Sequence, residues 1–358
     1  MRCSNRFCKL SGEAMSAVYI ATQSMSLSLR NSVMRLETGL SRAQDEATSG
    51  RRADPGLALG GSARRVIAIR FDSVRLASQV ETNKVASTRL SATQNVLTDI
   101  LETAKALQNT LLQDHGDANA RAASRQEAVD GLSHMASALN SAVGGRYLLG
   151  GVADAAAPMA SPAANPAAVS SAFQAKFGIP PGALASSALS AADVQSFLDN
   201  DHAGLFDAAN WSANWSRASD QLSQHRLAPH EIIDAGATAN DPAFRRLAQA
   251  MSMVANLGGG GLNDSAYQAL TTKAASLLGE AIAGVTQVSA MIGAVQCQVD
   301  RASSQASVRI DLLAQAEDAL LGVDAYEAST RVTRLQSQIQ IAFQLTGQLR
   351  NLNLFDAL

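Results

Sequence analysis

Two parts of the C-terminal stretch decide the fold: LGEAIAGVTQVSAMIGAVQCQV (residues 278–299) and VTRLQSQIQIAFQLTGQLRNL (residues 332–352). In both parts, apolar residues recur at alternating steps of three and four, and no proline occurs from Ser276 to Leu358. Such spacing keeps one stripe of a helix apolar and predicts that this stripe packs against other helices. The polar run Arg301–Ser307 and Gly322 lie between the two parts. We therefore expect two helical segments rather than one uniform helix.

A matching pattern lies near the N-terminus. The apolar stripe there continues to Ala47, and Ser49-Gly50 then provides a helix-stop signal. An Asp54-Pro55-Gly56 turn follows. Because a middle segment inserted between two helical arms requires those arms to meet, we expect the two end patterns to pair. The predicted assembly seam consists of Leu29, Val33, Leu36, Leu40, Val332, Leu335, Ile339, Leu345, Leu349 and Leu352.

Two further helices are predicted before the middle of the chain. The first runs from about Ala63 to Gln113, and the second begins near Ala118 and stops at Gly144-Gly145. Asn83 lies on the apolar stripe of the first helix. An asparagine there either fixes register and partner number or lies at the edge of the stripe.

The middle of the chain has a different composition. Residues 153–171 are rich in alanine, serine and proline without periodicity, which indicates a linker or loop. Trp211 and Trp215 are four apart, so their rings would share one face of a helix and form either an aromatic core or a binding surface. Asp241-Pro242 predicts the start of another helix, which ends at Gly258–Gly261.

The predicted fold class is therefore mainly α. Long helices and coiled coil come from both chain ends, with a smaller inserted domain between them for which an α+β fold stays open. The expected division is a terminal coiled-coil region (15–50 and 318–358), a helical core domain (51–150 and 266–317) and an inserted surface domain (151–265). Residues 1–14 are interpreted as an extension outside the native protein, with Met15 or Met25 as its start.

Composition restricts the partners of this chain. The formal net charge is −2 and aromatic residues make up 4%, so nothing favours binding to nucleic acid. No apolar run long enough for a membrane-spanning helix is evident, and no membrane partner is expected. Cys297 lies inside the apolar pattern and is predicted to be a small buried side chain.

No motif of a catalytic site occurs in the sequence. Nucleophile elbows, zinc-protease motifs, phosphate-binding loops and dinucleotide fingerprints are all missing, so we predict no enzyme activity and no cofactor. A cluster of His225, His230, Glu231 and Asp234 is the one candidate metal site. Its spacing does not match a helix face, and we expect no metal there.

Several segments resemble the bacterial flagellin family, and within it the proteins that join hook to filament. LSRAQDEATSGRRADPGLAL (residues 40–59) resembles the family's helix stop and the turn after it, although it is shorter. NKVASTRLSATQNVLTDI (residues 83–100) resembles the following core helix. GRYLLGG (145–151) and the ending LRNLNLFDAL (349–358) are similar to stretches of the junction proteins, and DAYEAST (324–330) resembles the entry to the terminal helix.

The resemblance implies a structural, self-assembling subunit of the bacterial flagellum. It implies a junction subunit between hook and filament, with a flagellin filament subunit as the alternative. The implied partners are further copies of the chain, hook-associated and flagellin neighbours, and an export chaperone. The implied location is extracellular, after export through the flagellar type III apparatus. A coiled-coil signalling scaffold is the alternative from another class, which the prolines and tryptophans of the middle segment disfavour.

Overall fold

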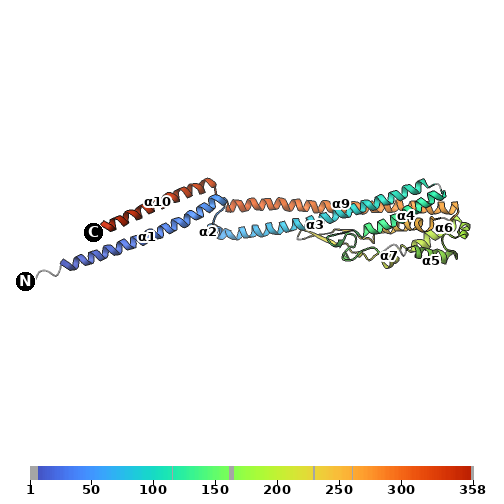
Figure 1. Ribbon diagram of the computed structural model, residues 1–358, viewed down its shortest axis with the longest axis horizontal. Helices are drawn as coiled ribbons and strands as arrows, with labels where there is room; N and C mark the ends of the chain where they lie inside the picture. The colour runs from blue at the N-terminus through green and yellow to red at the C-terminus, as the bar shows by residue number, and fades with distance from the viewer. Residues whose placement is uncertain (1–6, 115, 161–164, 229, 260, 356–358) are drawn as a thin grey trace, which may run out of the picture. The chain divides into compact units, whose positions relative to one another are not determined.

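The computed structural model describes residues 7–114, 116–160, 165–228, 230–259 and 261–355. Side chains are described from Ser24 onward, except at a few positions and after Gln348. The chain divides into two compact units, which we call the terminal unit (residues 1–76 and 308–358) and the middle unit (residues 77–307). Helices α3 and α9 each contribute residues to both units (Figure 1).

The described residues are mainly helical, which confirms the predicted fold class. The helices are α1 (Phe7–Ser49), α2 (Pro55–Leu59), α3 (Ala63–Gln113), α4 (Ala118–Leu139), α5 (Asn165–Phe177), α6 (Ala191–Phe197), α7 (Ala208–Asn214), α8 (Pro242–Leu257), α9 (Asp264–Leu321) and α10 (Ala325–Phe355). The strands form two antiparallel pairs, β1 (Ala142–Val143) with β2 (Arg146–Tyr147) and β3 (Gln224–Ala228) with β4 (Glu231–Asp234).

Local sequence signals set most helix boundaries. Asp117 begins α4 because its Oδ1 accepts the backbone N–H groups of Asn119 and Ala120, both at 2.9 Å. Asp241 begins α8 in the same way, because its Oδ1 accepts the N–H of Ala243 at 2.8 Å. Pro242 is the first helical residue. Such caps satisfy backbone donors that have no partner inside the helix.

Several expectations from the sequence are wrong in detail. The helix predicted to reach Gly144 ends at Leu139, since Gly144 and Gly145 take φ values of 62° and 77° and form the turn between β1 and β2. α5 begins inside the predicted linker at Asn165. Cys297 is exposed rather than buried.

The polar run Arg301–Ser307 does not break the C-terminal helix. α9 continues through it to Leu321, and the hydroxyls of Ser303 and Ser304 donate to the carbonyl groups of Val299 and Asp300 one turn earlier. Ala306 is buried and continues the apolar stripe with a small side chain. The interruption occurs at Gly322, so the two segments are α9 and α10.

Within the described part of the chain, one helix satisfies the length and composition of a membrane span. This is α9, which contains an 18-residue window of mean hydropathy 1.4. No membrane span is predicted there from the sequence, because polar residues interrupt the apolar ones. Of that window 28% is buried. Val285, Val288 and Ile292 are among the residues of α9 that lie in the core of the middle unit.

A single hydrophobic core fills the middle unit. Its largest fully buried side chains come from α3, α4 and the segments between α4 and α9, namely Leu90, Leu97, Ile100, Leu107, Met135, Leu139, Leu149, Phe173, Phe197, Leu198, Trp211 and Phe244. Residues of the predicted core domain and of the predicted insert thus share this core. The separate domain boundaries proposed from the sequence stay a prediction.

Aromatic rings are concentrated in one part of that core. Trp211 and Trp215 stack at 5.4 Å between ring centroids, and Phe206 lies 5.1 Å from Trp215. His202, which is completely buried, continues the series at 5.2 Å from Phe206. Both tryptophan side chains are buried, so the pair forms an aromatic core and not a binding surface.

The segment GRYLLGG (residues 145–151) contacts several other parts of the middle unit. Leu149 is fully buried and its carbonyl accepts the N–H of Ala239 at 2.8 Å. Arg89 and Arg146 both pair with Asp154 at 3.2 Å. At Gly151, φ is 63° and an added Cβ would lie 2.5 Å from the carbonyl oxygen of Ser219. This glycine is required by both its conformation and its surroundings.

Replacing Gly151 by alanine is expected to destabilise the middle unit by about 2–4 kcal/mol, from the positive φ and the backbone clash together. Gly144→Ala is the matched control, since its φ is 62° but an added Cβ would meet nothing within 4 Å. It should cost about 1 kcal/mol. Urea unfolding followed by tryptophan fluorescence measures both. Equal losses in the two variants would contradict the role of the clash.

Candidate assembly surface

Backbone hydrogen bonds join the segment that follows α1 to the segment between α9 and α10. The N–H of Val323 donates to the carbonyl of Gly50 at 2.9 Å, and the N–H of Arg52 donates to that of Leu321 at 2.9 Å. Gly50 takes a φ of 68°, which turns the chain sharply after α1. These bonds bring the two chain ends together, as the inserted arrangement requires (Figure 1).

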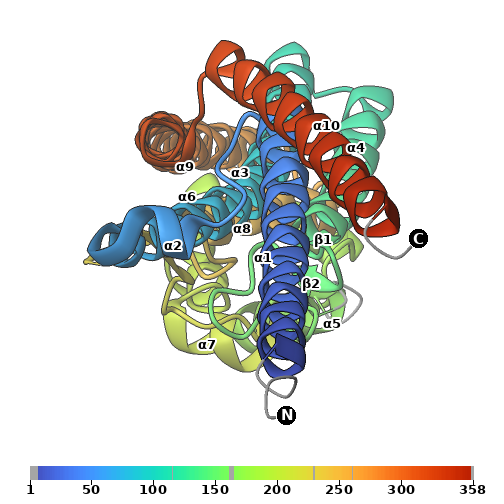
Figure 2. The same ribbon diagram turned by 90° about the vertical axis from the view of Figure 1, so that its left-hand side faces the viewer.

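α1 and α10 pack side by side within the terminal unit (Figures 1 and 2). Gly39 faces Leu335, since a Cβ added there would lie 3.8 Å from the methyl groups of Leu335, an ordinary contact distance. Ala43 of α1 is buried at the same interface. Arg331 pairs with Glu46 at 2.9 Å, so Glu46 holds an interhelical ion pair and is not simply a solvated residue.

The predicted seam residues lie on these two helices and divide into three groups. Those that the structure leaves half-buried are Leu29, Val33, Leu36, Leu40, Val332, Leu335 and Ile339. Leu345 is exposed, at 47% of its surface. The side chains of Leu349 and Leu352 lie outside the described residues. One chain alone therefore covers this seam incompletely.

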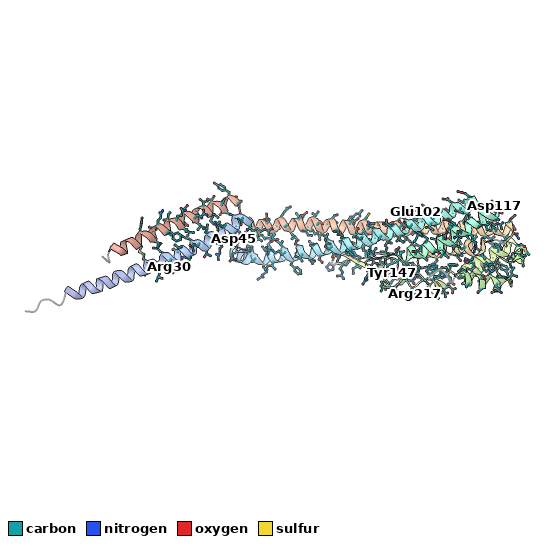
Figure 3. The ribbon with its side chains drawn as sticks, viewed as in Figure 1. Arg30, Asp45, Glu102, Asp117, Tyr147 and Arg217 are labelled. Carbon is teal, nitrogen blue, oxygen red and sulfur yellow. The ribbon has the colours of Figure 1, made fainter. Side chains whose placement is uncertain are left out.

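An open groove runs along a second face of α1. It measures about 870 Å³, and its lining includes Leu27, Asn31, Met34, Arg35 and Thr38. Leu27 and Met34 are more than half exposed. Figure 3 shows Arg30 and Asp45 on the same helix, and both are exposed charges. The seam thus uses one face of α1 and leaves another without a cover.

The terminal unit also has an apolar stripe that the sequence analysis missed. Ile67, Phe71 and Val74 of α3 follow one another at steps of four and three, and each is about 70% exposed. Val308 and Leu312 of α9 are 58% exposed. Helical spacing alone could have shown the stripe on α3, but exposure decides that it is not part of the core. Contiguous exposed apolar residues usually mark an interaction surface.

The residues of the candidate metal cluster lie on and beside the β3–β4 pair. His225 lies on β3, where its Nε2 is 2.8 Å from Oδ1 of the buried Asn83. Burial lowers the pKa of His225. Among the described residues no three histidine, cysteine or acidic side chains come together as metal ligands. Asn83 is thus at the centre of its stripe rather than at the edge, and it joins β3 to α3.

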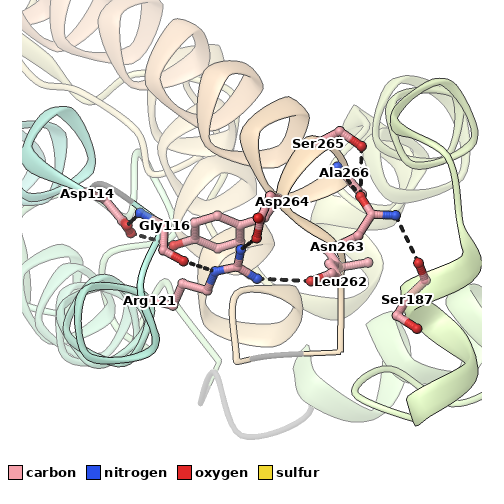
Figure 4. A network of polar contacts seen from close by, with 10 residues as sticks. Asp114, Gly116, Arg121, Ser187, Leu262, Asn263, Asp264, Ser265 and Ala266 are labelled. Carbon is pink, nitrogen blue, oxygen red and sulfur yellow. Dashed lines mark hydrogen bonds and ion pairs between the residues drawn. The ribbon is translucent and has the colours of Figure 1, made fainter.

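A network of polar contacts lies at the turn between α3 and α4 in the middle unit (Figure 4). Asp114 accepts hydrogen bonds from Tyr267, from Ser124 at 2.7 Å and from the N–H of Gly116 at 2.8 Å. Burial would raise the pKa of Asp114, but these hydrogen bonds outweigh it and lower that pKa. Arg121 lies over the ring of Tyr267 at 4.2 Å. All members are partnered with one another, which indicates a structural role.

The likeness to known proteins fits this architecture. Residues 20–154 match the bacterial flagellin N-terminal helical region, and residues 275–358 match the bacterial flagellin C-terminal helical region. The chain belongs to the bacterial flagellin family. Members of this family are structural proteins of the flagellum that self-assemble and lack enzyme activity.

One solved structure that resembles this flagellin-family chain comes from Vibrio parahaemolyticus and is provisionally described as a flagellar hook-associated protein. The TM-score is 0.51 at 11% identity, over 73% of this chain and 97% of the other. At that identity the likeness shows a shared fold. No curated protein matches the chain.

Proposed function

We propose that this chain is the junction subunit between hook and filament, of the kind called hook-associated protein 3. The observation that carries self-assembly is the incompletely covered surface of the terminal unit. Apolar side chains on α1, α3, α9 and α10 are half-buried or exposed although they follow helical spacing. Covering them against neighbouring copies would offset the loss of conformational freedom that ordering the terminal helices requires.

The junction role rests on two short stretches. GRYLLGG and the ending LRNLNLFDAL are similar to those of junction proteins, as described above. The fold of the hook-associated relative is consistent with that role. In this proposal the protein is exported through the flagellar type III apparatus with a chaperone and contacts hook-associated and flagellin neighbours. It needs no cofactor and contacts neither nucleic acid nor membrane.

A filament subunit is the second candidate, because the family match covers the helical regions that flagellins share. Position in the flagellum separates the two. Gold-labelled antibody against this chain should mark one short zone where the hook meets the filament, with a small number of copies per flagellum. Label spread along the filament, in thousands of copies, would contradict the junction role and support the filament role.

A further inference from the structure

Tyr326 is a large aromatic side chain that its own chain does not use. It is the second residue of α10, and 82% of its surface is exposed. Its backbone is held firmly, because Oδ1 of Asp324 accepts the N–H groups of Tyr326 at 2.7 Å and of Glu327 at 3.3 Å. A capped helix end thus presents an aromatic ring next to the carboxylate of Asp324, while the carboxylate of Glu327 pairs with Arg331 at 2.9 Å. Tyrosine in such a position is a frequent anchor of protein interfaces.

The same unit contains a groove with complementary properties. It lies between α3 and α9, measures about 330 Å³ and is lined by Asp72, Arg75, Leu76, Arg309, Leu312 and Leu313. Its apolar surface comes from the three leucines and its rim carries the two arginines. Arg75 pairs with Asp72 at 2.9 Å, whereas no ion pair to Arg309 occurs among the described residues. The groove is large enough for one aromatic side chain.

A chain cannot fill its own groove with its own Tyr326. α9 is an unbroken helix from Leu313 to Leu321, which separates the groove from the start of α10 by about 12 Å along the helix. The side chain of a tyrosine is shorter than that distance. The groove and the ring therefore suit two different copies.

We propose that Tyr326 of one copy docks into the α3–α9 groove of a second copy, with Asp324 facing Arg309. This rests on the proposed self-assembly and names the contact that drives part of it. The contact joins two different patches of the same chain, so repeating it builds a ring or an open helix instead of a closed dimer. Opposite charges around an aromatic anchor would fix its orientation.

The proposal is tested on the full-length chain by sedimentation. Tyr326→Ala and Arg309→Glu should each raise the Kd of self-association by about tenfold or more. Tyr326→Phe, which keeps the ring, should stay within about threefold of the unmodified chain. Gln336→Ala, at an exposed position of α10, is the matched control. Because the side chains of Tyr326 and Arg309 are exposed, none of these changes should affect folding.

A mixing experiment gives the sharper outcome. An equimolar mixture of Tyr326→Ala and Arg309→Glu retains one intact ring and one intact groove per pair, so it should form 1:1 dimers of near-normal affinity and nothing larger. Unchanged assembly of Tyr326→Ala alone, or no gain on mixing, would overturn the proposal while leaving self-assembly intact.

If the unmodified chain stays monomeric in solution, cysteine cross-linking in isolated flagella decides. The variant keeps Tyr326 and the groove leucines and carries cysteines at exposed neighbouring positions, Ala325→Cys and Val308→Cys, with serine at Cys3, Cys8 and Cys297. A ladder of covalent dimers and larger species is expected, whereas monomers in a chain that is incorporated would overturn this contact. A chain that is missing from the flagella even without substitutions would instead contradict the proposed function.

Discussion

A chain shortened by residues 331–358 is expected to be missing from assembled flagella while its middle unit stays folded. The deletion removes most of α10, including Leu335, which packs at Gly39, and Arg331, which pairs with Glu46. α1 then has no partner for its apolar face. The buried core of the middle unit lies entirely between Ala86 and Val299 and loses nothing.

Two measurements check this expectation. Immunoblots of isolated flagella should show no shortened chain, and cells that depend on it should not swim. Thermal unfolding followed by tryptophan fluorescence should give a melting temperature within about 2 °C of the full-length chain, as expected when no core contact changes. Normal incorporation of the shortened chain would contradict the role of the terminal helices in assembly.

A point substitution makes the same test without a deletion. Leu335→Asp places an unpaired charge against α1 and should prevent assembly, because a charge without a partner is unfavourable in a packed interface. Gln336→Asp is the matched control, since it adds the same charge at the neighbouring exposed position. Equal behaviour of the two variants would show that net charge, and not the seam, controls assembly.

Acid is expected to unfold the middle unit through His202. Burial lowers the pKa of His202 to about 3, against about 6.5 in an unfolded chain. Its Nε2 lies 3.4 Å from Oγ of Ser252, while its Nδ1 has no hydrogen-bond partner among the described residues. The imidazole is therefore held neutral by its burial inside the aromatic core.

The direction of the effect follows from proton binding. Between pH 6.5 and pH 3 the unfolded chain binds a proton at this site and the folded chain does not, so the free energy of unfolding decreases as the pH falls. It is at its full value above pH 6.5. The loss contributed by His202 between pH 7 and pH 4.5 should be roughly 3 kcal/mol.

Replacing His202 by leucine should remove most of that loss. The measurement is urea unfolding at pH 7 and at pH 4.5, followed by tryptophan fluorescence, because Trp215 and His202 both contact Phe206. His134→Leu, at an exposed position, is the control and should keep the dependence on pH. A smaller part should persist in the His202 variant, because burial also lowers the pKa of His225. An unchanged dependence in the His202 variant would contradict this explanation.

The sequence was sufficient where a local signal marks a boundary. The bounds of α3 agree with the prediction, and Asp241-Pro242 begins α8 as its capping chemistry requires. It was insufficient where small residues carry the apolar stripe. Ala302 and Ala306 continue the buried face of α9 through a run that appears polar in the sequence, so a break was expected there that does not exist.

The spacing of apolar residues in the sequence predicts the assembly helices, but it does not show which of their faces are exposed. Spacing places Leu335 and Leu345 on one stripe, yet the first is half-buried and the second is exposed. Ile67, Phe71 and Val74 have the same spacing as a core stripe and are exposed. Cys297 lies between two stripe residues and was expected to be buried, but it belongs to another face of α9. Which face finds a partner depends on packing between distant segments.

Both tryptophans of this chain lie in the aromatic core of the middle unit. Their fluorescence emission therefore reports on that unit alone and does not depend on whether α1 and α10 are ordered. The circular dichroism signal of helices reports on the middle unit and on α1 and α10. If the terminal helices become ordered during assembly, the dichroism signal will grow while the tryptophan spectrum stays constant, so an unlabelled sample can show the two events separately.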